Sequence, residues 1–232
     1  MSDKANDFSA IVLSLINTAA LIGFPESVPV ISMVSPLLQR IIERGFSMFH
    51  GKASAEIECA RLGIAYRYAV DTINDNIVAG KQLREDGFLE SINNSQHTHA
   101  DEIVEATLRN VINDAEIQKS ILYGKLIGQM PFLSGYSVSE MVSLNTILRQ
   151  LSTFDVENLR EFSDRKVHNL KELEVEVKRG AGKETGHRFV SLIHLKNLGL
   201  IVRQFPATLG LELENETISS TGYQLLQILH LV

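Results

Sequence analysis

The chain has no tryptophan and a single cysteine, Cys59, among its 232 residues. One cysteine excludes an internal disulfide, and nothing in the composition indicates an oxidising compartment. With ten Phe and five Tyr, aliphatic side chains must fill most of the core. The first residues place Asp3 and Asp7 beside Lys4, the wrong charge balance for a secretory signal. We therefore expect a cytoplasmic protein.

Excess charge of one sign is also small. The formal net charge is -6, with 44% hydrophobic and 22% charged residues. These values are typical of an ordinary globular protein. They argue against a surface wholly committed to nucleic acid or anionic membrane.

The N-terminal region is rich in apolar residues but has no long uninterrupted run. Its apolar halves cover 8–24 and 27–39, with Pro25, Pro29 and Pro36 in or beside them. Each half is shorter than the roughly 20 residues that span a bilayer. We predict apolar helices within 8–50 that pack on a helical body. The alternative is a membrane-active hairpin formed by residues 8–39.

Helical periodicity dominates from residue 38 to about 165. Apolar stripes predict helices along 38–49, 62–77, 104–126 and 137–151, followed by a short helix over 153–162. Gly80 is placed to end the second helix. Thr98 with Asp101 and Ser137 with Glu140 have capping-box spacing. The sequence thus predicts a mainly α fold with a helical body over 1–165.

After residue 186 the pattern changes to helix, strand, turn, strand and helix. Gly199 fits the end of the first helix, 200–203 and 211–215 have strand composition, and Ser219 or Ser220 fits the start of the last helix. We therefore predict a linker region over 166–186 and a small α+β, winged-helix-like module over 187–232.

Two segments of the C-terminal region carry a family resemblance. "FVSLIHLKNLGLI" (189–201) and "ISSTGYQLLQIL" (218–229) resemble the end of bacterial winged-helix-like modules, with Ser219 and Gly222 at the Thr and Gly positions of the last helix. Together with 65–88 and 105–130, the layout resembles uncharacterised bacterial helical proteins of the abortive-infection alpha type. That resemblance implies a role in phage defence or immunity and supplies no catalytic residue.

The stretch "KRGAGKETGHR" (178–188) combines glycines with basic residues. A phosphate-binding P-loop requires a hydroxyl where Glu184 stands and a glycine where Val177 stands, so that motif fails. Lys178, Arg179, Lys183 and Arg188 remain speculative contacts for a nucleic acid or anion. A solvated linker is the plainer interpretation.

Catalytic and metal-binding patterns are missing from the sequence. His97 and His99 lie near Asp101 but lack a known ligand spacing, and Cys59 is best interpreted as a packed small side chain. We expect no enzyme, no cofactor and no metal. The favoured function is a non-enzymatic interaction protein that binds a protein partner, or a second copy of itself, through its helical body. A DNA-binding regulator and a membrane-active effector are the alternatives.

Overall fold

The protein is mainly helical, as predicted. The computed structural model describes residues 44–45, 49, 56–90, 92, 97–163, 168–180, 182–203 and 215–231. The predictions for residues 8–39 lie outside the described residues. In chain order the elements are α4 (Glu56–Val78), α5 (His99–Asn113), α6 (Lys119–Gln129), the 3₁₀ helix η1 (Met130–Phe132), α7 (Val138–Gln150), α8 (Thr153–Ser163), β1 (His168–Asn169), α9 (Leu170–Lys178), α10 (Lys183–Asn197), β2 (Ile201–Arg203), β3 (Asn215–Ile218) and α11 (Ser220–Ile228).

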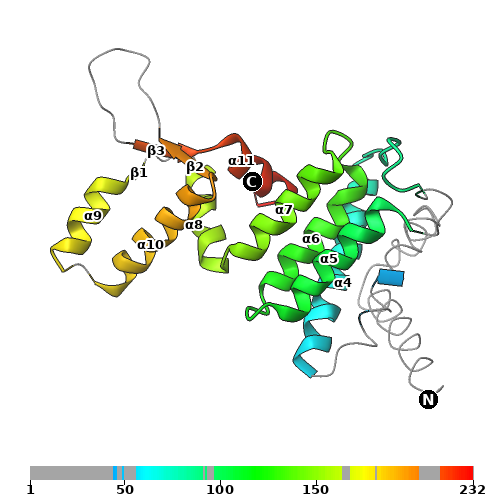
Figure 1. Ribbon diagram of the computed structural model, residues 1–232, viewed down its shortest axis with the longest axis horizontal. Helices are drawn as coiled ribbons and strands as arrows, with labels where there is room; N and C mark the ends of the chain where they lie inside the picture. Colours follow the sequence, from blue (N-terminus) through cyan, green and yellow to red (C-terminus); the bar gives the residue numbers. More distant parts are fainter. Residues whose placement is uncertain are drawn as a thin grey trace, which may run out of the picture.

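Helices α4 and α6 form the closest contact of the body, shown with α5 and α7 in Figure 1. A Cβ atom built on Gly124 would lie 2.4 Å from the Ala65 carbonyl oxygen, and one on Gly128 would lie 2.6 Å from the Ala69 carbonyl oxygen. Glycine therefore lets the two backbones touch. Since both residue numbers rise together, α4 and α6 run parallel.

The predicted helix boundaries rest on local signals, and the structure confirms several of them. Thr98 and Ser137 each form a reciprocal capping box, with Asp101 and Glu140 respectively. Ser219 accepts a hydrogen bond from the Gly222 amide at the start of α11. Gly199, with φ of 70°, follows α10 as predicted. Each signal depends on neighbouring residues only.

The prediction of one helix along 104–126 was wrong, because α5 and α6 divide this stretch. Asp114 has an extended backbone (ψ of 141°), and its carboxylate accepts a hydrogen bond from the Glu116 amide at 3.0 Å. A side chain that binds the backbone two residues on is a turn former. The apolar stripe continues across the break, so periodicity alone did not reveal it.

The C-terminal part follows the order helix, strand, helix, helix, strand, strand from α8 to β3. The sheet has the antiparallel order β1–β3–β2, with His168 opposite Glu216 and Ile201 opposite Ile218. The strand at 200–203 is confirmed, whereas most of the one predicted over 211–215 lies outside the described residues. The segment 166–186, predicted as a linker region, contains β1, α9 and the start of α10. The proposed domain boundaries stay a prediction.

Helices α8 and α11 connect the helical body with the C-terminal part. Helix α8 contacts α10 and β3, and α11 contacts both α8 and α6 (Figure 1). Within the described residues, no helix has the combined length and apolarity needed to cross a bilayer.

Candidate functional site

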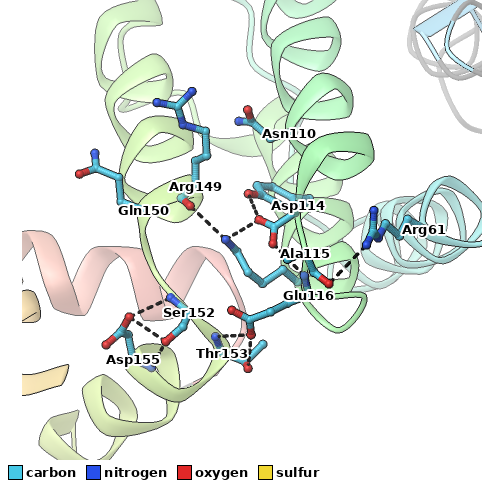
Figure 2. Close-up of polar contacts among 12 residues, drawn as sticks. Arg61, Asn110, Asp114, Ala115, Glu116, Arg149, Gln150, Ser152, Thr153 and Asp155 are labelled. Atoms are coloured by element: carbon cyan, nitrogen blue, oxygen red, sulfur yellow. Dashed lines mark hydrogen bonds and ion pairs between the residues drawn. The ribbon is translucent and has the colours of Figure 1, made fainter. Parts of the chain in front are cut away.

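A polar cleft of about 390 Å³ lies where the α5–α6 connection meets the α7–α8 connection (Figure 2). Amide, hydroxyl and charged side chains dominate its wall. The lining residues are Asn110, Asn113, Asp114, Ala115, Glu116, Lys119, Arg149, Gln150, Leu151, Ser152 and Asp155.

One wall of the cleft contains a buried ion pair. Lys119 Nζ lies 2.5 Å from Asp114 Oδ2, and only 4% of the Lys119 side chain is exposed. The Tyr123 hydroxyl donates to the same oxygen at 3.0 Å. Burial acts to raise the pKa of Asp114, but hydrogen bonds from Lys119, the Glu116 amide and Tyr123 outweigh it and hold that pKa below its usual range. Burial, followed by the Asp114 charge, raises the pKa of Tyr123. The lysine thus already has partners within the chain.

Two basic side chains satisfy the carbonyl ends of helices around the cleft. Lys119 Nζ donates to the Arg149 carbonyl at 3.0 Å, at the end of α7. Arg61 donates to the carbonyl of Ile112, in the last turn of α5, at 3.0 Å and to that of Ala115, just after the helix, at 3.3 Å. Cations at helix C-termini stabilise the exposed carbonyls and the helix dipole. These contacts explain both side chains structurally.

Two carboxylates hold the opposite helix end, at the start of α8. Glu116 Oε2 accepts from the Thr153 amide at 2.9 Å and from the Thr153 hydroxyl at 2.5 Å. Asp155 Oδ2 accepts from the amide and hydroxyl of Ser152, both at 2.8 Å, while the Ser152 hydroxyl accepts from the Asp155 amide. Negative charge at a helix N-terminus is stabilising. The cleft is therefore built from helix-end contacts.

Asp155 also joins α8 to α10. Its Oδ1 accepts from the Ser191 hydroxyl at 2.6 Å, and its Oδ2 lies 3.2 Å from His194 Nδ1. Burial acts to raise the pKa of Asp155, yet the hydrogen bonds from Ser191 and Ser152 keep it below its usual range. Asn158 completes the network by donating to Ser191 at 2.9 Å.

This Ser–His–Asp set does not have the geometry of a catalytic triad. In a triad the hydroxyl binds the imidazole, whereas here the Ser191 hydroxyl donates to the carboxylate. Ser191 is also 4% exposed and out of reach of a substrate. Nor do the described residues contain a group of three or more His, Cys, Asp or Glu side chains arranged to hold a metal ion.

The four basic residues predicted as nucleic-acid or anion contacts lie around the α9–α10 turn, and none lines the cleft. Lys178 pairs with Glu174 at 2.5 Å, and Arg188 pairs with Glu161. Arg179 and Lys183 are exposed. His99, considered above as a metal ligand, begins α5 and lies 3.6 Å from Glu102.

Sequence reasoning missed the residues that build the cleft. Ser152 and Asp155 have the same spacing as the two capping boxes that were predicted, so this local signal was available. The contacts from Asp155 to Ser191 and His194 span more than 30 residues, and no sequence pattern announces them.

No family model, curated protein or solved structure matches this chain. The likeness to abortive-infection alpha proteins therefore stays an expectation from sequence.

Proposed function

We propose that the protein is a non-enzymatic interaction protein whose helical body binds a partner protein at the polar cleft. The observation that carries this proposal is a pair of exposed apolar side chains, Ile117 and Phe154, each 40% exposed. Each follows directly in sequence one member of the Glu116–Thr153 contact. The two residues are therefore neighbours of the Glu116–Thr153 hydrogen bond, and Glu116 lines the cleft.

The character of the cleft supports binding over chemistry. Its carboxylates and its buried lysine already have partners within the chain, so no polar group there is poised for proton transfer or nucleophilic attack. An apolar anchor beside a polar, hydrogen-bonding rim is the common anatomy of a protein interface. Exposed Arg149 and Gln150 supply that rim.

Substitution of the two apolar anchor residues, with a matched control on the same helical body, tests the proposal. Phe154→Ala and Ile117→Ser should each remove a partner that co-purifies with the wild-type chain from its native host. Val142→Ser is the control, because Val142 is 50% exposed on α7 and is a neighbour in sequence of neither Glu116 nor Thr153. Melting temperatures should stay close to wild type in all three. An identical set of co-purifying partners for the anchor variants and the control would contradict the proposal.

A second candidate function is DNA binding by the C-terminal part. The element order from α8 to β3 and the sheet order β1–β3–β2 favour a winged-helix-like unit, in which α10 would be the helix offered to DNA. However, Val190 and Ile193 are exposed on α10, by 66% and 37%, and three residues apart they share a face. Apolar side chains there give few hydrogen bonds to base edges.

We therefore expect no measurable duplex binding at physiological salt. If α10 does contact DNA, Lys183→Gln and Arg188→Gln should weaken binding and flatten its salt dependence. A clear gel shift of random-sequence duplex by the wild-type protein, reduced in these variants, would place the regulator function above the interaction protein.

A further inference from the structure

A cluster of basic side chains lies away from the cleft, where the C-terminal segment meets the body. His230 follows α11 and contacts Gln129, which is 1% exposed, at the end of α6. Lys125 precedes Gln129 by one helical turn on the same face of α6. The segment that follows α4 lies beside the same end of α6, because the Lys81 amide donates to the Asn76 carbonyl and the Arg84 amide donates to the Pro131 carbonyl just after α6.

These cations are poorly neutralised by the rest of the chain. Among the described residues, no carboxylate lies within ion-pair distance of Lys81 or Lys125. Burial lowers the pKa of His230, and the charges of Lys81 and Lys125 lower it further against the opposing effect of Asp75. Burial and then the charge of Arg160 likewise lower the pKa of the half-buried Lys125. His230 and Lys125 are therefore less stable in their charged forms than they would be in water.

The backbone of His230 adds an independent observation. Its φ of 51° is left-handed, a conformation that no other described residue except glycine adopts. The Leu231 amide donates to the Leu226 carbonyl at 2.9 Å, and the His230 amide to the Gln227 carbonyl at 3.1 Å. This bonding closes the end of α11 as in a Schellman motif, in which glycine is the usual residue at this position. Histidine adopts this conformation more readily than most residues other than glycine, and here it keeps an imidazole in contact with Gln129.

We propose that Lys81, Lys125 and His230 form a binding site for a phosphate group. A phosphate would supply the missing negative charge and accept hydrogen bonds from two ammonium groups and the imidazole. Gln129 fixes the ring from the buried side. The site is separate from the cleft, so it stands or fails independently of partner binding there.

Titration of the whole chain with inorganic phosphate, at ionic strength held constant with chloride, tests the site. The His230 ring resonances, assigned by NMR with a His230 variant, should shift and saturate, and the pKa of His230 should rise when phosphate is bound. Lys125→Met should weaken binding by roughly tenfold or more, the size of one lost charge-assisted hydrogen bond. Lys171→Met, which removes an exposed lysine on α9, should bind as the wild type does.

His230→Gly separates binding from folding. Glycine suits the left-handed backbone, so this variant should remain folded, with a melting temperature near that of wild type, while phosphate affinity falls. Adenosine monophosphate in place of phosphate identifies the source: tighter binding indicates a nucleotide, and equal binding indicates free phosphate. An absence of saturable shifts in the wild type, or equal affinity in Lys125→Met, would overturn the proposal.

Discussion

Two helix contacts in this molecule are built on opposite principles. The α4–α6 contact brings backbone against backbone, since Gly124 and Gly128 meet the Ala65 and Ala69 carbonyls. The α8–α10 contact instead contains a polar network in which Asp155, Ser191 and His194 satisfy one another. The first contact fixes the distance between the two helix backbones and leaves no room for a side chain at the glycines. The second contact fixes which side chains of α8 and α10 bind each other. The two contacts should therefore fail under different perturbations.

The largest expected effect comes from adding a methyl group at the α4–α6 contact. In Gly128→Ala the new Cβ would lie 2.6 Å from both the Ala69 carbonyl oxygen and Thr72 Cβ, so the helices must separate. We expect a loss of about 3 kcal/mol in the free energy of unfolding, measured by urea denaturation.

Gly63→Ala is the matched control, because nothing lies within 4 Å of a Cβ at Gly63 in the same helix pair. Alanine there should stabilise the protein by about 0.5–1 kcal/mol. A loss of stability in both variants would contradict the close-contact explanation.

The polar contact should respond to loss of its central acceptor. Asp155→Ala leaves the Ser191 hydroxyl and His194 without their acceptor and removes the α8 capping box, at a cost of about 2 kcal/mol. Asp71→Ala, which breaks an exposed pair with Arg67, should change stability by less than about 0.5 kcal/mol. Equal effects of the two substitutions in urea denaturation would show that the network contributes nothing.

Acid should weaken the polar contacts that Asp155 and Asp114 make. The folded-state pKa values of Asp114 and Asp155 lie below their ordinary value. Their contribution is therefore fully present above an unfolded pKa of about 4 and is lost as pH falls through the folded values. Unfolding free energies measured from neutral to acidic pH should fall more steeply in wild type than in Asp114→Asn. Parallel curves would contradict the assignment of Asp114.

The smallest predicted effect is at a helix cap. Ser137→Ala removes the Ser137 hydroxyl that accepts a hydrogen bond from the Glu140 amide in the α7 capping box, and it should lower the free energy of unfolding by about 1 kcal/mol. Ser139→Ala, at an exposed position two residues later in the same helix, should be neutral or slightly stabilising because alanine favours helix. Thermal denaturation of the two variants should show this difference in sign; a reversed order would exclude the cap as a stabilising element.

What the sequence revealed follows the same division between local and distant contacts. Capping boxes and the glycine after α10 involve neighbours, and they could be predicted. Strand β1 has two residues and pairs only because Asn215 and Glu216 return to it, so no local pattern could reveal it. The division between α5 and α6 depends on Asp114, whose side-chain partners Lys119 and Tyr123 lie further along the chain, in α6. The cleft combines a capping box at Ser152, which its spacing could have predicted, with contacts from Asp155 to α10, which no local pattern predicts.

The central claim is that the cleft, with the apolar anchor residues Ile117 and Phe154 at its edge, binds a protein. A photo-cross-linking amino acid at position 154, compared with the same residue at position 142 on α7, tests it most directly in the native host. We expect one discrete cross-linked adduct at 154 and none at 142. Absence of an adduct at 154, or the same adducts at both positions, would contradict it.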